Sequence, residues 1–154
     1  MTALPPTDPE WQRIWFSARQ HGWNSLAIVP SHSGIDVLAI AKALAATGRA
    51  HGERPVGVIN ATGVQLENVQ QVIATLGALP DRGESALVPV DPIDENPSAV
   101  AIVQAASAAL LVVRLGESRL GPANLTLELI GRNRFLGSVI LDDASRPLFS
   151  SSRG

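Results

Sequence analysis

Short apolar segments alternate along the chain with segments whose apolar residues recur at helical spacing. The apolar segments predict strands at 26–29, 55–60, 85–91, 108–114 and 137–141. The segments with helical spacing predict helices at 9–21, 37–46, 65–76, 97–107 and 122–131. Strands that alternate with helices are typical of βαβ units with right-handed crossovers. We therefore predict an α/β fold with three layers, helix–sheet–helix, around a mostly parallel, doubly wound sheet.

Two strands carry information about their place in the sheet. Residues 108–114 (AALLVVR) are the most apolar segment of strand length, so we expect a central strand there. Pro89 lies within 85–91 and indicates an edge or irregular strand, because proline cannot donate to the ladder. The following core candidates come from the helical spacing: Leu66, Val69, Ile73, Leu76, Leu125, Leu129 and Ile130.

The chain of 154 residues has room for one domain with a substantial core, which we place at 9–142. Residues 1–8 are rich in proline and are expected to be flexible. Residues 143–154 are polar and rich in serine, and we expect a disordered tail. Residues 77–84, which include Gly77 and Pro80, are expected to form a loop.

Composition narrows the classes of partner. A net charge of −2 and a pI near 5.9 give no electrostatic reason to expect a nucleic-acid partner or an acidic membrane surface. No apolar run approaches the roughly 20 residues of a membrane span, and the first residues do not resemble a signal peptide, so we expect a cytoplasmic protein without direct membrane insertion. The chain has no cysteine, and its three histidines have no metal-site spacing, so no metal site is predicted.

The stretch 25–46 is the strongest candidate for a binding site. It combines a buried strand, a turn that contains Ser33 and Gly34, and a helix, and nucleotide-binding α/β proteins place their phosphate loop at such a position. A phosphate loop ends in Gly-Lys-Ser or Gly-Lys-Thr, with the lysine on the β- and γ-phosphates and the hydroxyl on Mg²⁺. Here the same place reads Gly34-Ile35-Asp36, and the only lysine of the chain is Lys42.

Each candidate residue also has a plainer interpretation. Asp36 is more simply an acid at the start of a helix, where the helix dipole favours it, than an altered metal ligand. His32 is interpreted as a surface-loop histidine without a partner. Asp91, with Asp94 and Glu95, is either an acid cluster for Mg²⁺ or a set of solvated loop carboxylates. Trp11 and Trp15 share one helical face and are either core residues or a contact surface for another protein.

Several segments together resemble the cytoplasmic domain of bacterial tyrosine kinases that partner polysaccharide co-polymerases, a family of the MinD/ParA-like P-loop ATPases. The resemblance covers most of 9–142 and implies a P-loop NTPase-like fold. The counterparts run in the family's order: Glu10-x-x-Arg13-x-x-Phe16, Ser33-Gly34-Ile35-Asp36, Val58-Ile59-Asn60-Ala61-Thr62, Val88-Pro89-Val90-Asp91-Pro92, Leu110-Leu111-Val112-Val113-Arg114-Leu115-Gly116-Glu117-Ser118, Glu128-Leu129-Ile130 and Leu136-Gly137-Ser138-Val139-Ile140-Leu141.

The sequence departs from the family pattern at the positions that bind nucleotide and Mg²⁺ and at those that are phosphorylated or support oligomerisation. Ile35 stands for the phosphate-loop lysine, Asp36 for the Mg²⁺-binding hydroxyl, and Asn60 and Thr62 for Walker A′ acids. Phe16 replaces the last arginine of the oligomerisation motif, and a chain without tyrosine cannot carry the family's tyrosine cluster. The resemblance therefore implies a degenerate member, with a degenerate nucleotide site at Ser33, Gly34, Asp36 and Asp91 and no catalytic residue.

The function that the resemblance implies is a non-catalytic pseudo-kinase or pseudo-ATPase module. It would act without a cofactor as a regulatory or scaffold subunit in bacterial exopolysaccharide synthesis or export. Its partner would be a protein, such as a membrane polysaccharide co-polymerase or glycosyltransferase that recruits it to the inner membrane, or a second copy of the chain. The expected contact residues are Glu10, Trp11, Arg13 and Trp15. The alternative is a lysine-free switch of the MinD/ParA type that binds ATP or ADP with Mg²⁺, with Arg114 or Arg119 in place of the lysine.

Overall fold

The computed structural model describes residues 9–52, 55–116, 120–142 and 147–151. The helices are α1 (Pro9–Arg19), α2 (Val37–Ala50), α3 (Val69–Arg82), α4 (Ser98–Ala105) and α5 (Leu120–Ile130), with short 3₁₀ turns at Leu66–Asn68 and Arg132–Arg134. The strands are β1 (Ser25–Pro30), β2 (Val56–Val58), β3 (Ser85–Pro89), β4 (Ala108–Arg114), β5 (Phe135–Leu141) and β6 (Pro147–Ser151). The predicted region 1–8 and parts of the predicted tail, 143–146 and 152–154, lie outside the described residues.

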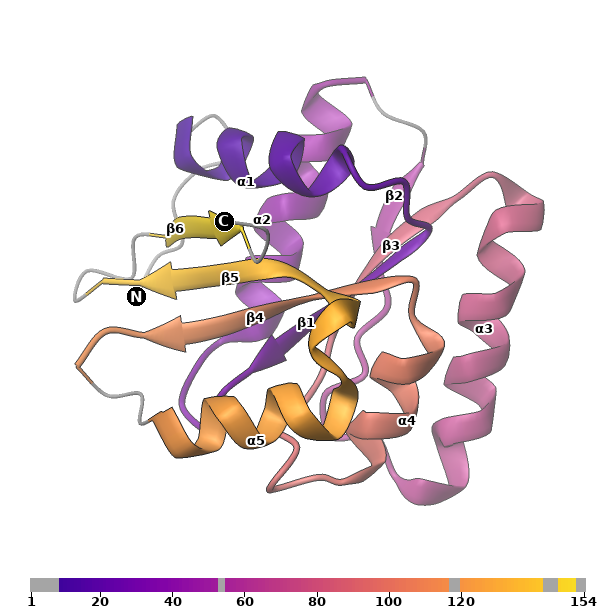
Figure 1. Ribbon diagram of the computed structural model, residues 1–154. Helices are drawn as coiled ribbons and strands as arrows, with labels where there is room; N and C mark the ends of the chain where they lie inside the picture. The colour runs from indigo at the N-terminus through magenta and orange to yellow at the C-terminus, as the bar shows by residue number, and fades with distance from the viewer. Residues whose placement is uncertain (1–8, 53–54, 117–119, 143–146, 152–154) are drawn as a thin grey trace.

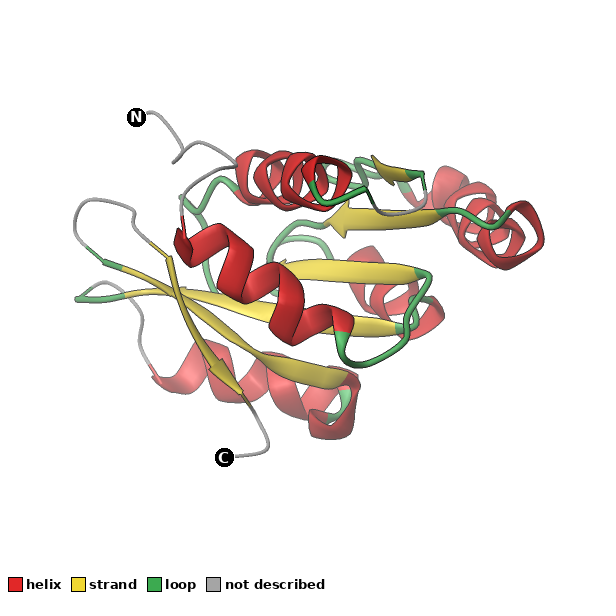
Figure 2. Cartoon of the chain, turned by 90° about the horizontal axis from the view of Figure 1, so that it is seen from above, coloured by secondary structure: helices red, strands yellow, loops and turns green. Residues whose placement is uncertain are grey.

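The strands form one sheet in the order β2-β3-β1-β4-β5-β6 (Figure 1). The first five are parallel to one another, and β6 is antiparallel to β5. Viewed from above, helices lie on both sides of the twisted sheet (Figure 2). The predicted α/β class, with three layers and a mostly parallel sheet, is confirmed, and the arrangement is that of a P-loop NTPase-like fold. The prediction that 108–114 is central is also confirmed, because β4 lies between β1 and β5.

All six residues of β1 are buried, and its side chains alternate between two cores. Leu26 and Ile28 pack with α1 and α2 on one face of the sheet. Ala27 and Val29 pack on the other face, against a cluster to which α3 and α4 contribute. Burial on both faces explains why this segment has no polar alternation, as is usual for an inner parallel strand.

Pro89 was predicted to mark either an edge strand or an irregular one, and the edge position is wrong, because β3 lies between β2 and β1. Pro89 is the last residue of β3, and its carbonyl accepts from Ala61 N at 3.0 Å on the β2 side. The nitrogen of Pro89 faces the same side, so the hydrogen bond that the proline cannot donate would lie just past the end of β2 at Val58. The inner strand therefore tolerates the proline.

The predicted loop at 77–84 is helical for most of its length. α3 continues through Gly77 and Pro80 to Arg82, and it ends at Gly83 with a left-handed φ of 63°. Gly83 N donates to Pro80 O at 3.1 Å, and Glu84 N donates to Leu79 O at 3.1 Å. These two hydrogen bonds satisfy the last carbonyls of the helix in the manner of a Schellman motif.

The predicted disordered tail is wrong for 147–151, which form β6. Its residues pair with β5 from Gly137↔Ser151 to Leu141↔Pro147. A Cβ atom at Gly137 would lie 2.3 Å from Ser150 O and 2.8 Å from the ring of Phe149, so a glycine on β5 allows β6 to approach. Three residues predicted as core are exposed instead: Leu66, Leu125 and Leu129.

Candidate functional site

The predicted site residues Ser33, Gly34, Asp36 and Asp91 line one pocket of about 340 Å³ at the carboxyl ends of β1 and β3. Chain segments leave these two neighbouring strands toward opposite faces of the sheet, since β1 leads to α2 and β3 leads to α4. Such a topological switch point is where open α/β sheets bind ligands. The other lining residues are Pro30, Ile35, Val37, Leu38, Thr62, Val90, Pro92 and Glu95.

Asp36 is the N-cap of α2, and its carboxylate Oδ1 accepts from Ala39 N at 3.0 Å. The first four N–H groups of a helix have no partner within the helix and are the groups that would hold a phosphate. Here Val37 N donates to Ile35 O at 3.1 Å. The chain itself therefore occupies two of these four donors, those of Val37 and Ala39, and the second is held by a carboxylate.

The charges around the pocket have one sign. Among the described residues, its ionisable lining residues are the acids Asp36, Asp91 and Glu95, and none of the described lysines, arginines or histidines lines it. Ile35 is only 8% exposed and packs in the core beneath α2, so it presents no polar group. Lys42 is exposed on α2 and does not line the pocket. A triphosphate would thus meet carboxylates with no neutralising side chain from the described part of the chain.

Asp91 joins two loops across the pocket. Its Oδ2 accepts from Gly63 N at 2.7 Å and from Asn96 Nδ2 at 2.9 Å, and Asn96 Nδ2 also reaches Val64 O at 3.1 Å. The loop after β2 is thereby tied to the loop after β3. The role of Asn96 was missed from the sequence, although an Asn just before a Pro-Ser helix start is a recognisable capping position, and its Oδ1 accepts from Ser98 N at 3.2 Å.

Asn60, at the position of a Walker A′ acid, forms a local turn with Thr62. Its Oδ1 accepts from Thr62 N at 3.0 Å and from Thr62 Oγ1 at 2.6 Å. This is the local side-chain-to-backbone bonding that Asn favours in turns. The amide oxygen of Asn60 is therefore used within the loop.

His32 and Arg114 lie outside this pocket. His32 is half-buried, and its Nδ1 is 2.9 Å from Ser31 Oγ, so the prediction of a surface histidine without a partner is wrong. Ser31 N donates to Val112 O at 2.9 Å, which fixes this loop beside β4. Arg119, the other arginine considered for the role of the lysine, lies outside the described residues, as does Ser118.

The structure places Trp11 and Trp15 in the core, at 2% and 1% exposure. The interpretation of these two side chains as a contact surface is wrong, because the face they share packs on the sheet and on α2. Trp15 meets the ring of Trp23 edge-on at 5.8 Å, and the guanidinium of Arg19 lies 4.4 Å from the Trp23 ring.

A surface of α1 that lies beside β6 remains accessible. Glu10 and Arg13 form an ion pair there at 2.6 Å. They line a groove of about 790 Å³ together with Phe16 and Leu148, which are 48% and 51% exposed. We call this the α1–β6 groove. The apolar part of this surface was missed from the sequence, because β6 was not expected and Phe16 was considered only as a lost arginine.

Two kinds of feature are absent from the described ranges, a metal site and a membrane-spanning helix. No group of three or more histidines, cysteines or acids there is arranged to hold a metal ion. None of the helices in these ranges has both the length and the hydrophobicity that crossing a bilayer requires.

Comparison with known proteins supports the fold. No family model matches the chain, and no curated protein matches its sequence. Among solved structures, the chain is similar to the kinase domain of the Escherichia coli tyrosine kinase ETK. The TM-score is 0.65 at 14% sequence identity, and the match covers 84% of this chain and 72% of that one. A bacterial tyrosine kinase domain is thus a structural neighbour of this chain.

Proposed function

We propose that this chain is a pseudo-kinase or pseudo-ATPase module that has kept a P-loop-like fold without phosphoryl transfer. The observation that carries the proposal is the state of the phosphate-loop position. Of the described residues, three carboxylates and no cationic side chain line the pocket there, and Asp36 caps the helix that would face a phosphate. Phosphoryl transfer depends on positioning and on stabilisation of negative charge, and this pocket offers the opposite charge environment.

The module would act by contact with other proteins, and the α1–β6 groove is its proposed contact surface. Exposed Phe16 and Leu148 supply apolar contact area, and Glu10 and Arg13 supply one charge of each sign. A surface with both charges can pair with a second copy of itself or with a protein partner. The site residues Glu10 and Arg13 thus keep their predicted role, while Phe16 and Leu148 replace the tryptophans.

The biological setting is proposed from the resemblance to tyrosine kinases of polysaccharide export. In that setting, the chain is a regulatory or scaffold subunit recruited to the inner membrane by a polysaccharide co-polymerase or glycosyltransferase. The similarity to the kinase domain of ETK supports the shared fold on which this resemblance depends.

A second candidate is a lysine-free nucleotide switch of the MinD/ParA type. The observation in its favour is that Asp91 stands at the switch point of the sheet, where a Mg²⁺-binding acid would be needed. This switch would bind ATP or ADP with Mg²⁺, and its affinity would depend on Asp91.

The deciding experiment is a titration of the purified chain with ATP and ADP, with and without Mg²⁺, followed by calorimetry and thermal unfolding. A nucleotide at 100 times its dissociation constant would stabilise the fold by about 2.7 kcal/mol. We expect no stabilisation at millimolar nucleotide. A shift that Asp91→Ala abolishes, while Glu67→Gln, at an exposed acid that does not line the pocket, leaves it unchanged, would replace the pseudo-enzyme proposal with the switch.

A further inference from the structure

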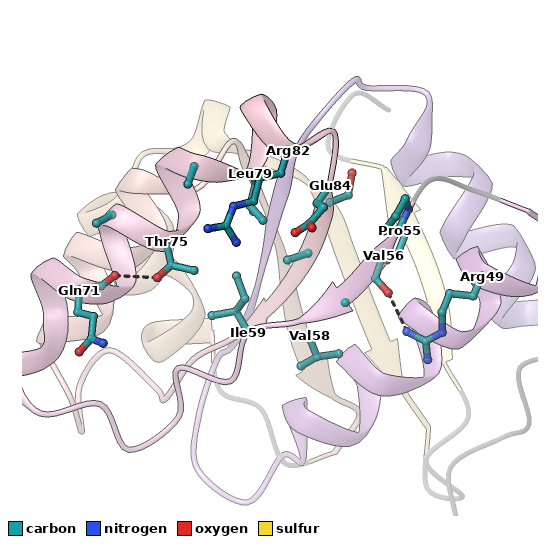
Figure 3. A pocket seen from close by; sticks show the side chains of 15 residues that line it. Arg49, Pro55, Val56, Val58, Ile59, Gln71, Thr75, Leu79, Arg82 and Glu84 are labelled. Carbon is teal, nitrogen blue, oxygen red and sulfur yellow. Dashed lines mark hydrogen bonds between the residues drawn. The ribbon is translucent and has the colours of Figure 1, made fainter.

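A second groove, of about 690 Å³, runs along the outer edge of β2 (Figure 3). β2 is the last strand of the sheet on this side. Arg49 of α2 flanks the groove on one side, and Thr75 and Arg82 of α3 flank it on the other. Since α2 and α3 pack on opposite faces of the sheet, the groove has the position that one more strand would occupy.

The backbone of β2 presents hydrogen-bonding groups to this groove. Ser85 N donates to Pro55 O at 3.0 Å, and Ile59 N donates to Leu87 O at 2.9 Å. The N–H and C=O of successive residues point to opposite sides of a strand, so the N–H and C=O groups of Val56 and Val58 point away from β3.

These outward groups differ in what they contact. Arg49 Nη1 donates to Val56 O at 2.7 Å. In the described part of the chain, the N–H and C=O of Val58 make no hydrogen bond. β2 therefore has an open donor and acceptor at the centre of the groove, the feature that strand addition uses.

The side chains around this edge define the kind of segment that would fit. Val58 and Ile59 are half-buried, so they leave apolar surface at the open edge. Arg82 is exposed and makes no ion pair or hydrogen bond with the described residues. In Figure 3 it lies on the α3 side of the groove, across β2 from Arg49. Two guanidinium groups against the single carboxylate of Glu84 favour acidic side chains in a ligand.

We propose that this edge binds an extended acidic peptide segment of a partner protein, which adds to the sheet beside β2. The N–H and C=O of Val58 would pair with its backbone. Successive side chains of an added strand point to opposite faces, so acidic residues at neighbouring positions would reach Arg82 on one face and Arg49 on the other. Because β2 has three residues, about five residues of the segment would be engaged.

A second copy of the chain fits this edge less well than a foreign acidic peptide. Pairing of β2 with β2 across a two-fold axis would bring the Arg49 and Arg82 side chains of both copies into one interface, against only two Glu84 carboxylates. Like charges opposed across paired strands are destabilising. This surface is also separate from the α1–β6 groove and from the pocket at Asp91, so the proposal does not depend on the state of the nucleotide site.

The test is a selection of random seven-residue peptides displayed on phage against the full chain. Selected peptides would then be synthesised and titrated against variants. We expect enriched sequences with acidic residues at two neighbouring positions, one for each face of the added strand. Val58→Pro removes the outward N–H while keeping the bonds to β3, since a proline is tolerated on an edge strand. It should weaken binding at least tenfold, as should Arg82→Glu.

Arg132→Glu is the matched control, because Arg132 is an exposed arginine that does not line the groove, and it should bind as the parent does. Amide hydrogen exchange on the parent chain adds a readout that does not depend on whether a variant folds. Bound peptide should slow the exchange of the Val58 N–H. Peptides that bind Val58→Pro and Arg82→Glu as well as the parent would overturn the proposal. It would also be overturned by enrichment of basic peptides, by a failure to enrich any, or by self-association of the chain that Val58→Pro abolishes.

Discussion

Gly48 of α2 lies directly against the indole ring of Trp15 of α1. A Cβ atom at position 48 would be 2.5 Å from ring atoms Cη2 and Cζ2 of Trp15, a separation that van der Waals contact does not allow. Both residues are buried, and Trp15 is held in turn by its edge-on contact with Trp23. The packing of α1 against α2 and the sheet therefore requires a glycine at position 48 of α2.

Gly48→Ala should destabilise the fold by about 1–3 kcal/mol, the usual cost of overpacking a close-packed core. Urea unfolding, followed by tryptophan fluorescence, would measure the change. The matched control is Gly77→Ala on α3, which has open space around its Cβ position and should stabilise by about 0.5–1 kcal/mol. Equal effects of the two substitutions would show that the approach of Trp15 to Gly48 does not matter.

Asp36→Ala should cost about 0.5–2 kcal/mol, because it removes the N-cap hydrogen bond to Ala39 N. Asp36→Asn should keep most of the stability, since asparagine caps as well as aspartate, while it removes one negative charge from the pocket. Thermal unfolding of both variants would measure this difference. If Asp36→Ala is as stable as the parent chain, the carboxylate is not engaged with the helix in solution.

Asp91 and Asn96 should be energetically coupled through their hydrogen bond at 2.9 Å. We expect each single alanine variant to destabilise by about 1 kcal/mol or more, because the Gly63 N–H or the Asp91 carboxylate then loses a partner. In a double-mutant cycle measured by urea unfolding, the coupling should be at least about 0.5 kcal/mol. Strictly additive effects would mean that Asp91 does not join the two loops.

Phe16→Asp with Leu148→Ser should reduce any self-association or partner binding, because the two substitutions remove the exposed apolar side chains of the α1–β6 groove. Sedimentation velocity over a range of concentrations would measure self-association. The control is Leu66→Ser, which changes a leucine that is 78% exposed and does not line this groove. If Leu66→Ser has the same effect as the double substitution, the contact surface lies elsewhere.

Amino-acid order alone was sufficient to predict the layers of this fold. The apolar segments alternate with segments of helical spacing, and this pattern indicated the parallel strands and their helices. A strand such as β1 that is buried on both faces shows no alternation of polar and apolar residues. The absence of the phosphate-loop lysine was equally visible, because that position is defined by residue type. The gathering of Ser33, Gly34, Asp36 and Asp91 at one pocket followed from the rule that parallel strands present their carboxyl ends at one edge.

Only the tertiary structure decided the features that depend on contacts between distant segments. The segment 147–151 becomes a strand because β5 offers an open edge and Gly137 leaves space for Phe149 and Ser150. Trp15 of α1 is core rather than surface because Gly48 leaves space for its ring. Helical spacing shows which residues share a face of a helix, but it does not show whether another element covers that face. Trp11 is buried because its face is covered, whereas Leu125 and Leu129 remain exposed.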